Sequence, residues 1–318
     1  MTIVITTNNP LTRNYSPTVD TKPAHRTDIL QPSRLCHPFE PTKHHIPPIK
    51  IILNKKRFDC TNGEQASPIL PDGTLLSLPI PSHDDIPFSK IHWHGTSFCD
   101  IIRQLNKNTL IGSDSRCHLD PDLRKEVRPR RPGWMPAFGQ KGSSLTELLN
   151  NNVAVGDIFL FYGWFKQTEF YDGKLCYLRG AKDIHAIYGY FQIGEIIREE
   201  KDIPEWLREH PHANHDKYDK DWERKQNAIF LPSRQLSFNP EWPGAGTFTF
   251  DRRKVLTKEG CSRSRWTFPD AMWDTPISHC PKGWRKDYFQ SAAIGQEFVM
   301  DTTPPVLDWL KAIFHTEN

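Results

Sequence analysis

The sequence predicts an α+β protein whose core is a mixed or antiparallel, barrel-like sheet with short helices and long loops around it. Two aromatic and apolar stretches in the middle of the chain, "GDIFLFYGWF" at residues 156–165 and "HAIYGYFQIGEII" at residues 185–197, have the composition of buried strands. The helical patterns are short, and the 27 prolines indicate long loops. We therefore expect one domain over residues 48–318.

The first 80 residues predict an extension, a strand, a turn and a second strand. Residues 1–47 are rich in Thr, Pro and Asn and carry no apolar stripe, which is typical of a disordered extension. Residues 49–54 are largely β-branched and follow two prolines, as a buried strand would. Pro71, Asp72 and Gly73 predict a turn, because Pro presets φ, Asp bonds the local backbone and Gly tolerates positive φ. Residues 75–80 then predict an edge strand.

The remaining elements follow in order. An apolar face predicts a helix at residues 96–107, loops fill residues 108–142, and Ser144 with Glu147 forms a capping box that opens a second helix. In the stretch at 184–197, period-two alternation predicts one apolar face and one wetter, aromatic face. Further elements are expected as a short helix near 202–210, strands at 228–231, 247–250 and 254–257, and a helix at 304–314.

Composition excludes several classes of protein. The chain has 318 residues and a net charge of +3, which neither demands nor excludes nucleic acid. Its seven cysteines form no C-x-x-C pair, and no secretory segment opens the chain, so an intracellular, cytoplasmic protein is expected. The longest apolar run is too short for a membrane span. Phosphate-loop, dinucleotide-binding, hydrolase-elbow and deaminase motifs are missing from the sequence.

The aromatic strands have a structural and a functional interpretation. Any single ring there is more often part of the core. At the rim, however, Trp164, His185 and Tyr188 could stack a base beside a glycine that admits a flat ligand. We therefore expect these three side chains to contribute to substrate binding.

Charged segments supply candidates for phosphate binding and proton transfer. In "NKKRFDC", Lys56 and Arg57 suit a phosphate, and Asp59 suits a base or a sugar-binding group, although a solvated strand end looks the same. In "GCSRSRWTFP", Arg263 and Arg265 lie on one side of an extended chain next to a tryptophan. An exposed arginine turn is an equally good interpretation of this second segment. Two further residues, Gln296 and Glu297, could read a base edge.

Histidines and carboxylates recur in three short segments. "CHLDPDL" places His118, Asp120 and Asp122 close together, which suits metal binding or proton transfer as well as it suits a local Asx turn. The histidines of "HWHG" favour a surface loop. "HPHANHD" contains His210, His212 and His215 without a ligand at a diagnostic spacing, so no zinc site is expected there.

Several of these segments carry a family resemblance. The Gly-Asp pair, the two aromatic strands and "GEI" resemble the strand pair of PUA-like modules (the ASCH and EVE relatives) within about residues 153–200. More widely, seven segments in order resemble the nucleotide modification associated domain family, third type: "KRFDC…SPILPDGTLLSLPIP", "CHLDPDL", "GWMPAFGQKG", "VGDIFLFYGWF", "DIHAIYGYFQIGEI", "CSRSRW" and "SAAIGQEFV". The resemblance implies a role in modifying bases or nucleotides.

Three functions stay open from the sequence. In the enzyme version, Asp59 or Asp120 moves a proton in a mixed aromatic and basic pocket, and Asp72, His118 and the residues above contact substrate. In the second version, a PUA-like reader binds modified nucleic acid without catalysis. In the third, a metal-dependent hydrolase uses His118, Asp120 and Asp122. The expected partner is a nucleotide or nucleic acid, DNA rather than RNA; cofactors and protein partners are not predicted.

Overall fold

The computed structural model describes residues 49–55, 58, 63, 65–83, 86–292 and 297–315. All of them lie in one compact unit, residues 46–318. The predicted extension at residues 1–47 lies outside the described residues.

The described residues form mainly strands, with a few helices between them. The strands are β1 (Lys50–Lys55), β2 (Ser67–Ile69), β3 (Ile80–Ser82), β4 (Ile86–Pro87), β5 (His92–Trp93), β6 (Thr96–Ser97), β7 (Arg116–His118), β8 (Phe138–Lys141), β9 (Ile158–Tyr171), β10 (Lys174–Tyr177), β11 (Ile184–Ile197), β12 (Asn227–Pro232), β13 (Gln235–Leu236), β14 (Asn239–Pro243), β15 (Ala245–Thr247), β16 (Arg265–Trp266), β17 (Phe289–Gln290) and β18 (Glu297–Asp301). The α-helices are α1 (Phe98–Leu105), α2 (Gly142–Asn150), α3 (His215–Glu223) and α4 (Pro304–Phe314), and short 3₁₀ turns include η5 (Pro211–Ala213).

One mixed sheet organises the unit, and its central path runs β18-β1-β9-β11-β12-β8. Strands β1 and β9 pair in parallel, and the other neighbours along this path are antiparallel. The path is curled, because Gln140 of β8 at one end donates a hydrogen bond to Glu297 of β18 at the other. The predicted α+β, barrel-like core is therefore confirmed.

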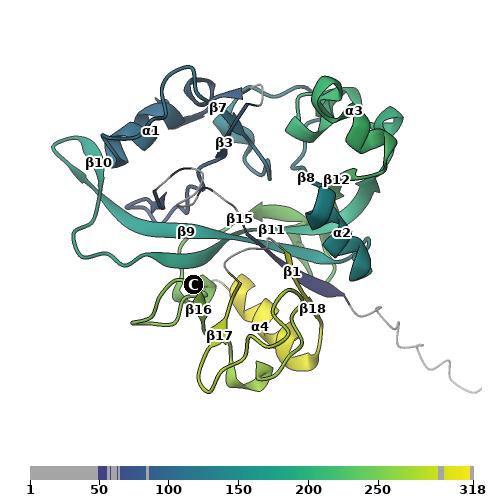
Figure 1. Ribbon diagram of the computed structural model, residues 1–318. Coiled ribbons are helices and arrows are strands. Elements are labelled where there is room, and N and C mark those ends of the chain that lie inside the picture. The colour runs from purple at the N-terminus through teal and green to yellow at the C-terminus, as the bar shows by residue number, and fades with distance from the viewer. Residues whose placement is uncertain are drawn as a thin grey trace, which may run out of the picture. The chain divides into compact units, whose positions relative to one another are not determined.

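Both faces of the sheet are covered. On the face toward α4, Tyr162, Ile187 and Tyr190 pack with Leu310 of the helix. We call this the α4 face. The opposite face buries a cluster of aromatic rings: Phe138, Phe159, Phe161, Tyr188, Phe191 and Phe230. Figure 1 shows β9 and β11 crossing the view, with α4, β16 and β17 on one side and α1, β3 and β7 on the other.

The predicted alternation of β11 is wrong. Its register with β9 shifts between Ile187 and Gly189, so Ile187 and Tyr190 lie on the α4 face, whereas Tyr188 and Phe191 lie on the opposite face. The shift interrupts the period of two, as a bulge does. Because both faces are covered, β11 has no wet aromatic face. The space above Gly189 is also filled, since an added Cβ would lie 2.6 Å from Leu123 Cδ1.

The other elements agree in part with the sequence. The first strand, the two long strands and the C-terminal helix are confirmed near their predicted bounds. The edge strand expected at residues 75–80 is absent, since that described segment forms only bridges at Thr74 and Leu75 before β3 begins. Helix α2 begins at Gly142 rather than at the capping box, and its N-cap, Lys141, makes no side-chain cap. No helix among the described residues is long and apolar enough to cross a membrane.

Candidate metal centre

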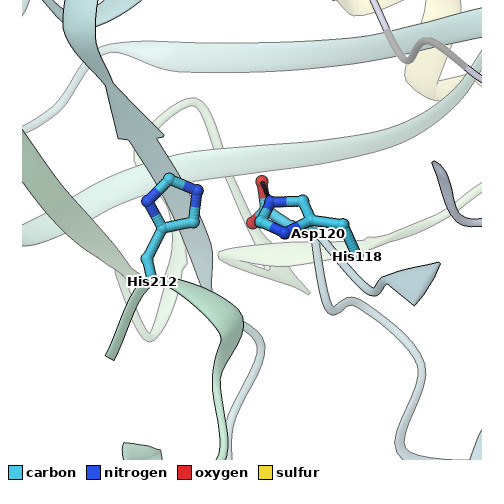
Figure 2. A group of neighbouring side chains, drawn as sticks. All are labelled: His118, Asp120 and His212. Carbon is cyan, nitrogen blue, oxygen red and sulfur yellow. Dashed lines mark ion pairs between the residues drawn. The ribbon is translucent and has the colours of Figure 1, made fainter. Parts of the chain in front are cut away.

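Two histidines and an aspartate from distant segments meet beside β8. His118 ends β7, Asp120 follows it by two residues, and His212 lies in η5. One ligand atom from each lies within 4.8 Å of the ligand atoms of the other two. Figure 2 shows the His212 ring on one side and the His118 ring and Asp120 carboxylate on the other. Asp120 and His212 are buried, and His118 is partly exposed.

Asn227 fixes the orientation of His212. Its amide nitrogen donates to the His212 carbonyl oxygen at 3.0 Å, so its Oδ1 must be the atom 2.7 Å from His212 Nδ1. Nδ1 then carries the proton, and Nε2 keeps a lone pair, which is the form that binds a metal. Burial also lowers the pKa of His212 to about 3, which keeps the imidazole neutral. The ring stacks on Tyr218 with 5.3 Å between centroids.

Asp120 is held from the other direction. Its Oδ1 accepts the Gly139 N–H at 2.7 Å and lies 3.3 Å from His210 Nε2. His210 Nδ1 accepts the backbone N–H of His212 at 3.3 Å, and its Nε2 is buried and makes no hydrogen bond to any described residue. The second oxygen, Oδ2, is 3.8 Å from His118 Nε2. One oxygen of the carboxylate therefore accepts from Gly139, and the other lies toward His118.

The segment that carries Asp120 is anchored to β8. Asp122 and Ala137, the residue before β8, exchange two backbone hydrogen bonds, of 2.9 and 3.1 Å. Asp122 itself binds Arg130 through both carboxylate oxygens, at 2.5 and 2.7 Å. Because a guanidinium occupies both oxygens, Asp122 does not join the cluster. The metal-hydrolase interpretation of the sequence had expected it there.

Gly139 makes room for His212. A Cβ at this position would lie 2.3 Å from Cγ and Cδ2 of the imidazole, a distance that real side chains do not reach. Glycine is therefore required here by the close approach of the ring. The same residue supplies the N–H that binds Asp120, so one position of "GWMPAFGQKG" serves two members of the cluster.

This donor set suits a transition metal. Two imidazoles and a carboxylate hold catalytic zinc in some enzymes and non-haem iron in others, and three protein ligands leave positions for water and substrate. The outer contacts also fit: an amide orients one imidazole, and an N–H orients the carboxylate. His215, the third histidine of its segment, is exposed and lies 2.9 Å from Glu200, away from the cluster.

The structure separates the predicted substrate contacts into two groups. Trp164 and His185 pair across β9 and β11, and Arg263 lies over the indole of Trp164 at 3.8 Å. His185 Nδ1 accepts the Trp266 N–H at 3.1 Å, and its ring contacts Tyr162 on the α4 face. Arg265 lies 5.1 Å from the Tyr288 ring centroid. Trp164, His185 and the two arginines form the first group.

Tyr188 belongs with Asp120 instead. It is buried on the opposite face, and burial, with the nearby Asp120 charge, raises the pKa of its hydroxyl. Asp72 lies in the predicted turn, where its Oδ1 accepts the Thr74 N–H at 2.9 Å, and this bond lowers its pKa. The described residues therefore form no single pocket that gathers Tyr188 with Trp164.

Four predicted site residues lie outside the described residues: Lys56, Arg57, Asp59 and Gln296. Two described neighbours, Lys55 and Asn54, nevertheless contact or influence other residues of the sheet. Lys55 is close enough to His185 to lower the pKa of that imidazole, together with burial and Arg263. Asn54 donates to the buried Glu297 at 3.2 Å across β1 and β18.

The sequence pattern does not single out four members of the cluster and its supports: Gly139, His210, His212 and Asn227. The only available signal was the density of histidines in "HPHANHD" and the His-x-Asp of "CHLDPDL". Neither segment contains a complete set of ligands, because each lacks the ligands that the other provides.

A comparison with protein families decides the affiliation of the chain. The family model described as nucleotide modification associated domain 3 matches residues 50–301. The chain belongs to the nucleotide modification associated domain 3 family. Its match spans β1 to β18, and thus the whole curled sheet and the candidate metal centre. No curated protein and no solved structure matches the chain, so the resemblance to PUA-like modules stays a prediction.

Proposed function

We propose that the protein is a metal-dependent enzyme that modifies a nucleotide or a nucleic-acid base, with the metal held by His118, Asp120 and His212. The observation that carries this proposal is the convergence of their three ligand atoms within 4.8 Å. The family supports this substrate class, since its description associates the domain with nucleotide modification. A reader of modified nucleic acid would need no such donor set.

The chemistry follows from an open metal site. A divalent ion with three protein ligands can lower the pKa of a bound water to near neutrality and can polarise a substrate oxygen. Asn227 keeps His212 in its metal-binding tautomer, and Gly139 orients the Asp120 carboxylate. Asp120 thus serves as a ligand in this proposal, rather than as the acid or base that the sequence predicted.

The proposal predicts that metal binding depends on His212 and not on His215. We expect the purified protein to carry roughly one transition-metal ion per chain, measured by mass spectrometry of the metals. His212→Ala should lose most of it, because one of three ligands is gone. His215→Ala is the matched control, since it removes an exposed imidazole from the same segment, and it should keep the metal.

A second variant guards against misfolding of the buried site. His118 is partly exposed, so His118→Ala should retain its circular dichroism spectrum and still lose metal. Added Zn²⁺, Mn²⁺ or Fe²⁺ at about 100 times the dissociation constant should stabilise the metal-free protein by about 2.7 kcal/mol. The proposal is wrong if the protein lacks stoichiometric metal and none of these ions changes its melting temperature.

A further inference from the structure

A second site lies away from the metal centre, at the end of β9 and β11. A pocket of about 930 Å³ opens between residues 180–184, 250–252 and 257–263. Its volume falls in the usual range for ligand pockets. His118, Asp120 and His212 do not line it. The pocket therefore requires an explanation of its own.

The lining of this pocket combines an apolar floor with a cationic rim. Ile184, Val255 and the half-buried ring of Phe250 supply apolar surface. Among the described residues, the rim has four cations, Lys182, Arg252, Lys258 and Arg263, against two acids, Asp183 and Glu259. An apolar ring beside a cationic rim suits a flat base joined to a phosphate.

The two acids reduce this positive charge only in part. Asp183 accepts the Trp164 indole N–H at 2.8 Å, and Arg263 lies over the same indole, so Trp164 contacts two residues of the pocket lining. Among the described residues, Lys182 and Arg252 lie within ion-pair distance of no acid, and both are exposed. They are the cations best placed to meet a phosphate.

The cationic surface continues beyond the pocket. Lys258, on the rim, binds the carboxylate and carbonyl of Asp287. Asp287 in turn lies near Arg265 and Lys286, whose charges help to lower its pKa after the contact with Lys258. Arg265 lies over the Tyr288 ring. Beyond the pocket, a chain of phosphates would thus meet further cations and a second aromatic ring.

We infer that this pocket receives one nucleotide of a single-stranded nucleic acid. The base packs against Phe250, Lys182 and Arg252 bind its phosphate, and the strand continues over Lys258 toward Arg265 and Tyr288. The inference goes beyond the proposed metal chemistry and does not rest on it, because the two sites share no residue.

Fluorescence anisotropy with a labelled oligothymidylate of twelve nucleotides tests this inference. The wild type should bind with an affinity that falls as KCl rises. The double variant Lys182→Ala, Arg252→Ala should bind more weakly, and the slope of log affinity against log salt should fall by about 1.4, because two phosphate contacts are lost. The control pair Lys107→Ala, Lys201→Ala removes two exposed cations elsewhere and should bind like the wild type.

A third variant tests stacking. Phe250→Leu keeps an apolar side chain and removes the ring, so affinity should fall by a factor between about 5 and 150. Thymidine monophosphate should displace the oligomer only at far higher concentration. No binding by the wild type, an unchanged double variant, or a monophosphate that competes as well as the oligomer would overturn the inference. Metal content, measured on the same variants, should stay unchanged, which keeps this result separate from the proposed function.

Discussion

At the scale of single residues, the candidate centre depends on how one imidazole is held. Asn227 is completely buried, and both ends of its amide bind His212. Tyr218 stacks on the ring, and Gly139 leaves the space that the ring occupies. A side chain fixed on all sides loses little entropy when it binds a metal, so the site is preorganised.

Gly139→Ala should therefore impair the centre without replacing a ligand. The added methyl would overlap the imidazole of His212, so either the ring or β8 must move. We expect metal affinity to fall about 10- to 100-fold, measured by competition with a chelating dye, together with a lower melting temperature. Gly112→Ala is the control, because its Cβ would approach nothing closer than 3.7 Å. Equal metal affinity in the two variants would contradict this prediction.

At the scale of elements, β8 connects the candidate centre to the closure of the sheet. Gly139 binds Asp120 at the free edge of the strand, and the next residue, Gln140, donates to Glu297 of β18. Glu297 also accepts a hydrogen bond from Asn54 of β1 at 3.2 Å. Glu297 is 1% exposed, so these two amides replace water at one oxygen of its buried carboxyl group, Oε1.

Removing one of these donors should destabilise the fold. Gln140→Ala takes a hydrogen bond from Glu297 and should lower the free energy of unfolding by about 1–3 kcal/mol, measured by urea denaturation. Gln235→Ala, an exposed position on β13, should change it by less than about 0.5 kcal/mol. If Gln140→Ala unfolds at the same urea concentration as the wild type, the link between β8 and β18 does not stabilise the sheet.

At the scale of the whole molecule, one sheet separates two different chemical environments. The α4 face buries His185 among Tyr162 and Trp266, while the opposite face carries Tyr188 near Asp120. The candidate metal centre and the cationic pocket have separate sets of residues, although Ile69, Ile184 and Phe250 of the pocket pack on the same face of the sheet as Tyr188. In the two proposals together, the protein would hold a strand at the pocket and modify it at the metal centre.

Burial of His185 makes stability depend on pH. Burial first, and then the charges of Lys55 and Arg263, lower the pKa of its imidazole from 6.5 to about 3. Between these values the unfolded chain binds a proton that the folded chain excludes. The free energy of unfolding should thus decrease as the pH falls from 6.5 toward 3, by up to about 1.4 kcal/mol per pH unit.

Urea denaturation at pH 7 and pH 5 measures this dependence. His185→Gln can still accept from the Trp266 N–H but has no proton to bind, so its stability should fall less between these pH values than that of the wild type. His92→Gln, at an exposed position, should behave like the wild type. An identical pH dependence in all three proteins would remove His185 as its cause.

Local pattern accounts for much of the fold. The β-branched run of β1, the two aromatic stretches of β9 and β11 and the paired prolines of α4 each specify their own element, because their residues determine burial or backbone angles locally. The bulge of β11 and the start of α2 could not be predicted in this way. They depend on the register with β9 and on the pairing of β8 with β12, which are tertiary contacts.

Residue patterns alone predicted the fold class and the family, and they singled out His118 and Asp120 as candidates for substrate contact, proton transfer or metal binding. Three further facts follow from long-range contacts: His212 joins them, Asp122 is bound to Arg130 instead, and Tyr188 and Trp164 lie on different faces of the sheet. The physical reason is distance along the chain. Local residues determine strands and turns, whereas a site assembled across ninety or so residues exists only after the sheet has curled and brought its segments together.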